Sequence, residues 1–332
     1  MEPSNQHYPG CRNIVRTALL QQCVPVSAVD ITMASLSENT LKQYEVCFKR
    51  WFTFCKENNV NMFETSIPII LEFLTNLFHS GAQYGTINSH RSALSLIFGN
   101  ISDDVRIIRF CKGVYKLRPP LPKYNVTWDA SIVLNHLATM FPNENLTLEA
   151  LSKKCITLLA LVTAHRVQTL SKIKIDQIVY QNSKIIIKIT DFIKTSKAGT
   201  KQPILHLPFF NDRPEICPAK TLDIYINKTK SIRKTDHLFI GFRKPYNCVT
   251  TQTLSRWIKS TLKDSGIDVS IFSSHSTRHA ATSMAHKLGV NLDIIRQTAG
   301  WSGNSTAFAQ FYNRPVINSD DDLLLARTIC SL

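Results

Sequence analysis

One segment in the second half of the chain combines residue types suited to holding a phosphate. The sequence reads SHSTRHAATSM from Ser274 to Met284, so His275 and Arg278 stand three residues apart. At the start of a helix, this spacing places two side chains on one face. Arginine offers a planar fork of N–H donors, and a helix N-terminus adds backbone donors and a positive dipole. The segment therefore predicts phosphate binding.

Two other interpretations of this segment compete with phosphate binding. His275 and His279 lie one helical turn apart and are of a type that binds metals. The glutamate of the His-Glu-x-x-His pattern is absent and no third ligand is apparent, so we expect no metal site. A solvated basic helix is the stronger alternative, and the phosphate interpretation needs support from elsewhere in the chain.

That support comes from four further features. Arg166 follows a long apolar segment, a basic turn reads KTSKAGTK over residues 194–201, and Trp301 and Tyr312 come later in the chain. Taken singly, each has an ordinary explanation. An arginine at a helix end is usually a cap, and a tyrosine beside a phenylalanine is usually part of a core. Their order along the chain, together with His275 and Arg278, is what distinguishes them.

The charge balance predicts a polyanionic partner. The 332 residues contain 39 Lys and Arg against 24 Asp and Glu, a net charge of +15. An excess of this size is typical of proteins that bind nucleic acid. Residues 153–263 hold 21 Lys and Arg against 6 Asp and Glu, so the whole excess lies in this one segment.

Other classes of protein are disfavoured by what the sequence lacks. The longest apolar run, near Cys155 to Ala164, is about half of the roughly 20 residues that a membrane-spanning helix needs, and no apolar signal core opens the chain. We therefore expect a soluble, intracellular protein. The nine cysteines form no Cys-x-x-Cys pair, which disfavours a disulfide framework or a zinc site. No glycine-rich phosphate loop occurs, which disfavours nucleotide chemistry.

The first half of the chain has the periodicity of a helical bundle. Ser35 and Glu38 have the spacing of a capping box, and apolar residues then recur at steps of three and four as far as Cys55. Further helices are predicted from Ser66, over residues 84–98 and from Asp103. The sequence KLRPPLPK over residues 116–123 contains three prolines, which predicts an extended linker and a domain boundary near residue 120.

The second half is predicted to be mainly helical with a small sheet. Runs rich in β-branched residues predict strands over residues 184–190 and 202–207, with the basic turn between them. The predicted helices cover residues 127–140, 146–163, 218–228, 251–264, 276–288, 291–299 and 304–313. The expected fold class is therefore mainly α with a small β-sheet (α+β).

The order and spacing of these residues resemble the catalytic domain of tyrosine recombinases, the family that includes phage integrases. In that family two arginines, a hairpin lysine, a histidine, a further histidine or tryptophan and a nucleophilic tyrosine surround one DNA phosphate. The resemblance implies DNA cleavage and rejoining through a 3′-phosphotyrosine, with no cofactor and no metal. The matching residues are Arg166, Lys197, His275, Arg278, Trp301 and Tyr312.

The sequence departs from the family pattern in three places. Thr169 stands where the family often has an acidic residue, which leaves the support of Arg166 open. The gap between Trp301 and Tyr312 is about two residues longer than in many bacterial relatives. Lys194 and Lys201 lie on the same turn as Lys197, so either could replace it as the hairpin lysine.

The resemblance also implies a domain organisation that clamps double-stranded DNA. Residues 35–116 resemble the helical core-binding domain, 117–125 the linker and 126–315 the catalytic domain. Residues 1–34 are expected to form an N-terminal arm or a short helix pair, and 316–332 a C-terminal tail. The expected DNA contacts, each also typical of a solvated surface, are Arg91, Arg106, Arg109, Lys112, Lys194 and Lys201.

Some segments resemble recombinases of DIRS-type and related eukaryotic mobile elements, namely YPG at 8–10, SENTLKQY at 37–44, LRPPLPKYNVTWD at 117–129 and FYNRP at 311–315. The DNA substrate and the basic stretches of the sequence imply a nuclear location. The family also implies a homotetramer on DNA, with the tail around residues 320–327 docking on a neighbour or folding back. The alternatives are a type IB topoisomerase-like enzyme and a catalytically silent DNA-binding protein.

Overall fold

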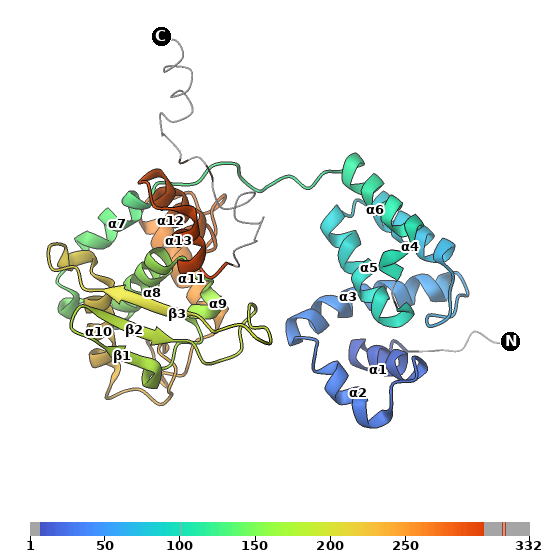
Figure 1. Cartoon of the computed structure of the whole chain (residues 1–332), viewed down its shortest axis with the longest axis horizontal. Coiled ribbons are helices and arrows are strands. Elements are labelled where there is room, and N and C mark those ends of the chain that lie inside the picture. Colours follow the sequence, from blue (N-terminus) through green and yellow to red (C-terminus); the bar gives the residue numbers. More distant parts are fainter. Residues whose placement is uncertain (1–6, 100, 302–313, 315, 317–332) are drawn as a thin grey trace, which may run out of the picture. The chain divides into compact units, whose positions relative to one another are not determined.

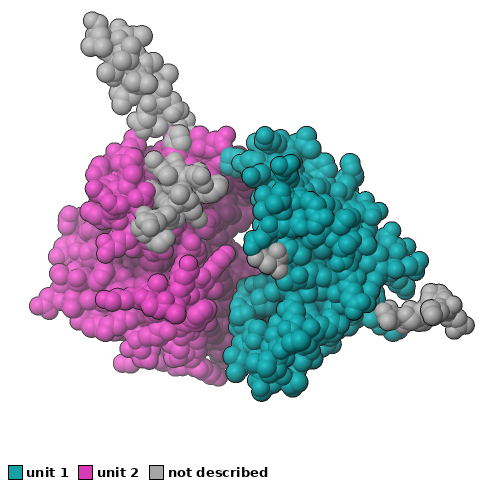
Figure 2. Space-filling view, turned by 45° about the vertical axis from the view of Figure 1, so that its right-hand side comes forward, with its two compact units in different colours: residues 1–122 teal, residues 123–332 magenta. Residues whose placement is uncertain are grey.

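The chain folds into two compact units, residues 1–122 and 123–332 (Figures 1 and 2). The computed structural model describes residues 7–99, 101–301, 314 and 316. The division between the units falls inside the proline-rich segment 117–125. Proline fixes its own backbone and restricts the residue before it, so this segment has no helix beyond Leu117.

The first unit is built from helices. Its core surrounds the fully buried ring of Trp51, whose neighbours are Phe54, Phe73 and Phe98 at 5.1–5.9 Å between ring centroids. The helices are α1 (Cys11–Gln21), α2 (Val26–Met33), α3 (Glu38–Glu57), α4 (Ile67–His79), α5 (Tyr84–Phe98) and α6 (Val105–Leu117).

Residues 11–33 are a helix pair rather than an arm apart from the domain. The buried side chains of α1 include Ile14 and Val15, which belong to the same core as Trp51. The helix α3 begins after Ser37, whose hydroxyl accepts a hydrogen bond from the backbone N–H of Thr40 at 3.1 Å. The predicted cap, Ser35, instead donates its backbone N–H to Thr32 at the end of α2.

The second unit is mostly helical with a three-stranded antiparallel sheet in the order β1-β2-β3, which confirms the predicted fold class. The third strand, β1, was not predicted because its three residues are too few to show a period. The elements are α7 (Ala130–Thr139), α8 (Leu148–Thr163), α9 (Val167–Leu170), β1 (Ile178–Tyr180), β2 (Lys184–Lys188), β3 (Ile204–Pro208), α10 (Pro218–Thr229), α11 (Thr251–Asp264), α12 (Ser276–Lys287) and α13 (Leu292–Thr298).

The sheet turns one face to the core. Ile185 and Ile187 of β2 are fully buried and pair in register with Leu207 and Leu205 of β3, so alternate residues of both strands point inward. Together they anchor the connection between β2 and β3, which carries the basic turn. The predicted helix over residues 304–313 lies outside the described residues.

The centre of the second unit is α8, against which α10, α11 and α12 pack (Figure 1). It is the most deeply buried helix of the unit and has 16 residues. Within the part of the chain that the structure describes, no helix is long and apolar enough to cross a membrane. The helix ends at Ala164, whose left-handed backbone (φ 48°) is unusual for a residue other than glycine.

The two alanines at and before the end of α8 give a test of this backbone strain. We expect Ala164→Gly to leave the free energy of unfolding unchanged or to raise it by up to about 1 kcal/mol, because glycine adopts the left-handed conformation without steric cost. The same substitution at Ala160, inside the helix, should lower it by about 1 kcal/mol or more. Urea unfolding of both variants provides the measurement, and equal losses in the two would contradict the assignment.

Candidate active site

Arg278 is the most constrained side chain of the second unit. It is the third residue of α12 and is 1% exposed. Its Nε donates a hydrogen bond to the carbonyl oxygen of Ala164 at 2.6 Å, and its Nη2 donates to that of Ala299 at 3.0 Å. These two carbonyls follow the last residues of α8 and α13. The guanidinium therefore ties the start of one helix to the ends of two others.

Trp301 lies against the same guanidinium. The Cζ atom of Arg278 is 4.2 Å from the centroid of the Trp301 ring, which is the geometry of a cation–π contact. The backbone N–H of Trp301 donates to the carbonyl of Arg296 in α13 at 2.9 Å. The turn after α13 thus places the indole beside Arg278, as the order of residues in the sequence predicted.

Arg166 is the N-cap residue of α9, two positions after Ala164. Its carbonyl accepts a hydrogen bond from the backbone N–H of Thr169 at 2.8 Å. Thr169, which replaces the acidic residue expected at this position, is 3% exposed. Among the described residues no carboxylate forms an ion pair with Arg166. The backbone of the turn holds this residue in place.

His275 is the N-cap residue of α12 and lies within electrostatic reach of both arginines. Partial burial and, after it, the positive charges of Arg278, Arg166 and Lys194 together lower the pKa of His275 to about 4. The imidazole is therefore neutral at pH 7, although part of its surface stays exposed. Its ring centroid is 5.6 Å from that of His279 in an edge-on contact.

A second histidine, His165, belongs to this cluster and was not predicted to do so. It stands between Ala164 and Arg166 and is 5% exposed. Burial lowers its pKa to about 4, with further contributions from Arg278 and Arg166. The only signal in the sequence was its position directly before a candidate arginine. Such a signal does not show which way a side chain turns.

The basic turn between β2 and β3 consists of two tight turns. In the first, Ile193 is 2% exposed, and its backbone N–H donates to Ser196 Oγ at 2.9 Å while its carbonyl accepts from Ser196 N at 2.9 Å. Lys194 follows Ile193 directly. In the second turn, Thr200 bonds to the backbone of exposed Lys197. Lys194 is thus the lysine nearer to the buried anchor.

An ionic network supports the base of this hairpin. The carboxylate of Asp191 forms ion pairs with Lys174 Nζ, at 3.1 Å from its Oδ1, and with Lys172 Nζ, at 3.5 Å from its Oδ2. Both lysines lie in the segment that follows α9, so the network joins the hairpin to the turn that carries Arg166. The nearby lysines lower the pKa of Asp191 against the opposing effect of its partial burial, which keeps the carboxylate charged.

The residues that follow the linker hold the first turn of α12. Trp128, which is 2% exposed, donates its indole N–H to Ser276 Oγ at 2.8 Å. The ring of Tyr124 contacts His279 at 5.5 Å between centroids. Ser276 lies between His275 and Arg278 in the sequence, so Trp128 fixes the part of the backbone that presents both.

Tyr312 lies outside the described residues, so its position relative to this cluster is not given. The two described residues beyond it are attached to the second unit. The backbone N–H of Arg314 donates to Ser283 Oγ in α12 at 3.0 Å, and Val316 pairs with Thr127 in a parallel bridge. Lys201 is exposed at the end of the hairpin turns.

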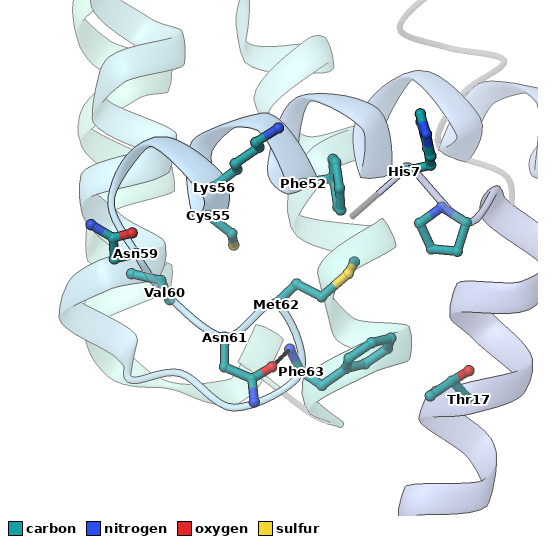
Figure 3. A pocket seen from close by; sticks show the side chains of 11 residues that line it. His7, Thr17, Phe52, Cys55, Lys56, Asn59, Val60, Asn61, Met62 and Phe63 are labelled. Atoms are coloured by element: carbon teal, nitrogen blue, oxygen red, sulfur yellow. Dashed lines mark hydrogen bonds between the residues drawn. The ribbon is translucent and has the colours of Figure 1, made fainter. Parts of the chain in front are cut away.

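The remaining basic residues predicted to contact DNA belong to the first unit. Arg106 is paired with Asp104 at 2.7 Å, and Arg109 is exposed. Arg91 and Lys112 line a cavity of about 370 Å³ between α5 and α6. A separate cavity of about 560 Å³ contains none of the predicted residues, and its lining includes Phe52, Met62 and Phe63 (Figure 3).

Comparisons with solved structures agree with this fold. XerH site-specific recombinase in a post-cleavage complex with difH DNA superposes with a TM-score of 0.64 at 14% identity, over 99% of this chain and 92% of that one. The Tn1549 transposon integrase with transposon end DNA gives 0.59 at 14%, over 96% and 99%. A lambda integrase tetramer on a Holliday junction gives 0.54 at 17%, over 93% and 78%. Among curated proteins, no sequence matches significantly.

The sequence profile of the phage integrase family matches residues 134–316, which is more than half of the chain. The match covers Arg166, the hairpin and α12, and it extends through Tyr312. The helical fold with its small sheet, the clustered arginines and this match lead to one conclusion. The chain belongs to the phage integrase family of tyrosine recombinases.

Proposed function

We propose that the protein is a site-specific recombinase that cleaves and rejoins DNA strands through a 3′-phosphotyrosine. The observation that carries the proposal is the cluster of Arg166, His275 and Arg278, with Trp301 stacked on Arg278. Cations held together favour an anionic ligand, and among the described residues no carboxylate pairs with Arg166. The DNA complexes of the similar solved structures support the choice of DNA as that ligand.

The two arginines would stabilise the negative charge that develops on the non-bridging phosphate oxygens. Such stabilisation is strongest when the donors are already oriented before the substrate binds. The carbonyls of Ala164 and Ala299 fix the plane of the Arg278 guanidinium. Arg166 is fixed through its backbone at the start of α9. The guanidinium of Arg278 therefore requires little reorganisation when DNA arrives.

In the first step Tyr312 attacks the phosphate and the 5′-oxygen leaves. The phenolic oxygen of Tyr312 forms a bond to phosphorus, and its proton passes to the neutral His275. The bond from phosphorus to the 5′-oxygen breaks, and that oxygen receives a proton from a hairpin lysine. Attack by a 5′-hydroxyl of another strand reverses these changes and reseals the backbone. Neither ATP nor a metal ion takes part in this scheme.

The structure favours Lys194 over Lys197 as the proton donor. The charge of Lys194 contributes to the lowered pKa of His275, so the two side chains are within electrostatic reach of each other. Lys194 also sits in the turn anchored by buried Ile193, and the Asp191 network supports the base of the hairpin. Lys197, the residue first matched to the family, lies in the outer turn and suits a contact to the DNA backbone.

We further propose that the enzyme serves a mobile element of the DIRS type, acts in the nucleus and assembles as a tetramer on DNA. The proposal on the element rests on the segments around residues 8–10, 37–44, 117–129 and 311–315. The similarity in fold to a transposon integrase and to a lambda integrase tetramer is consistent with it.

The first prediction concerns covalent chemistry. Incubation with a nicked duplex carrying the terminal repeats of the element should give a protein–DNA adduct that survives denaturation, and Tyr312→Phe should abolish it because no nucleophilic oxygen remains. Tyr180→Phe, which removes an exposed hydroxyl on β1, is the matched control and should retain it. Absence of an adduct would refute the recombinase. Relaxation of plasmids without site preference would indicate a topoisomerase instead.

The second prediction separates the two lysines. Lys194→Ala should slow adduct formation by about 100-fold or more, the usual contribution of a general acid, whereas Lys197→Ala should slow it by less than about fivefold. A substrate with sulfur at the 5′ bridging position needs no proton on its leaving group, and it should restore the rate of Lys194→Ala. Restoration of Lys197→Ala alone would return the role to Lys197.

The third prediction uses the lowered pKa of His275, which is about 4. Above that pH the imidazole is neutral and can accept a proton. The ratio of the adduct-formation rates of the wild type and His275→Gln should therefore stay constant from pH 6 to 8 and fall as the pH approaches 4. A ratio that already falls between pH 7 and 6 would show that His275 titrates near its ordinary value.

A further inference from the structure

His165 is a buried polar side chain to which the scheme above gives no part. It lies in the turn between α8 and α9, directly after Ala164 and directly before Arg166, and is 5% exposed. The backbone of Thr298, the last residue of α13, lies close enough to the imidazole to influence its pKa. The side chain therefore bridges two turns that are more than 130 residues apart in the sequence.

The imidazole also lies directly against Gly300. A Cβ atom built on Gly300 would come within 2.8 Å of His165 Cε1 and 3.4 Å of its Nδ1. A Cβ contact of 2.8 Å is shorter than real Cβ atoms show, and a ring that is only 5% exposed cannot easily move aside. The left-handed backbone of Gly300 (φ 72°) adds a second reason for glycine at this position.

These contacts connect His165 to both of the turns that contact Arg278. Ala164, its preceding neighbour, supplies one carbonyl to Arg278. Gly300, against which its ring packs, precedes the Trp301 ring that stacks on Arg278. A shift of the His165 ring would displace the turn of α8 and the turn of α13 relative to each other, and the guanidinium bonds to both.

We propose that His165 is a positioning residue that sets the distance between the Arg166 turn and the Gly300–Trp301 turn and so fixes the Arg278–Trp301 pair for phosphate. The inference rests on the proposed function, because its readout is DNA cleavage. Its role is indirect. The imidazole acts through the residues it separates and does not itself contact the phosphate.

A histidine suits this role because it stays uncharged. Arg166 and Arg278 surround it, and a permanent cation at this point would add repulsion to the cluster. Burial holds the imidazole in its neutral form, which still offers polar nitrogen atoms to the nearby backbone of Thr298. An aliphatic side chain of similar size would offer that backbone no polar partner.

The test compares two glycines with similar backbones. Gly300→Ala introduces both left-handed strain and the collision with His165, whereas Gly289→Ala introduces the strain alone, since no described atom lies within 4 Å of a Cβ there (φ 85°). At saturating DNA and at a temperature where every variant is folded, we expect Gly300→Ala to slow adduct formation at least tenfold. Gly289→Ala should slow it less than threefold, and neither should change DNA affinity more than threefold.

The double variant shows whether the effect passes through His165. His165→Ala should itself slow cleavage at least tenfold, and His165→Gln, which keeps a hydrogen-bonding group, should recover part of that loss. In His165→Ala the ring that collides with a Cβ at residue 300 is gone, so adding Gly300→Ala should slow cleavage no more than Gly289→Ala does. Multiplicative effects of the two substitutions, or equal effects of the two glycine variants, would overturn the proposal.

The outcome is separable from failure of the proposed function. If the wild type forms no adduct, the recombinase proposal fails. The same four proteins (wild type, His165→Ala, Gly300→Ala and the double variant) are then compared by urea unfolding. A coupling free energy near zero between His165 and Gly300 would refute the contact itself. If the two residues are coupled in stability but the cleavage rates of the variants do not show the same coupling, the positioning role is refuted.

Discussion

The site depends on a buried arginine that is held by the ends of two helices. Ala164 and Ala299 are the C-terminal cap residues of α8 and α13, and their carbonyls accept the two hydrogen bonds of Arg278. A helix C-terminus carries roughly half a negative charge, so two of them offset about one cation. Hydrogen bonds to charged groups contribute about 1.5–3 kcal/mol each. The guanidinium is thereby both stabilised and oriented.

Helix carbonyls differ chemically from a carboxylate as partners of an arginine. A carboxylate beside the guanidinium would compete with an incoming phosphate, whereas helix carbonyls cannot leave or take up a proton. Among the described residues no acid pairs with Arg166, and Thr169 stands where the family often has an acidic residue. Burial and, after it, the positive charges of the arginines lower the pKa of His165 and of His275 to about 4. Burial and charge together thus keep both imidazoles neutral.

The sequence allowed the helical architecture and most of the clustered residues to be predicted, because these depend on periodicity and on side-chain type. The bounds of α5 and α11 follow from apolar spacing and end signals. The partners of Arg278 could not be predicted, since every residue has a backbone carbonyl and only the fold selects two of them. The same limit applies to His165 and to Lys194, whose roles depend on which neighbours are buried. Tyr312 rests on the family match alone.

The bridge between Thr127 and Val316 joins the segment where the chain enters the second unit to a residue that follows Tyr312 in the sequence. Thr127 lies two residues after the proline-rich linker segment, and Val316 comes four residues after Tyr312 in the sequence. Trp128, which follows Thr127, donates a hydrogen bond to Ser276 in the first turn of α12. Tension applied along the linker would therefore reach the start of α12 and the chain beyond the tyrosine through one attachment. The linker therefore connects the two units and can also transmit force to the active site.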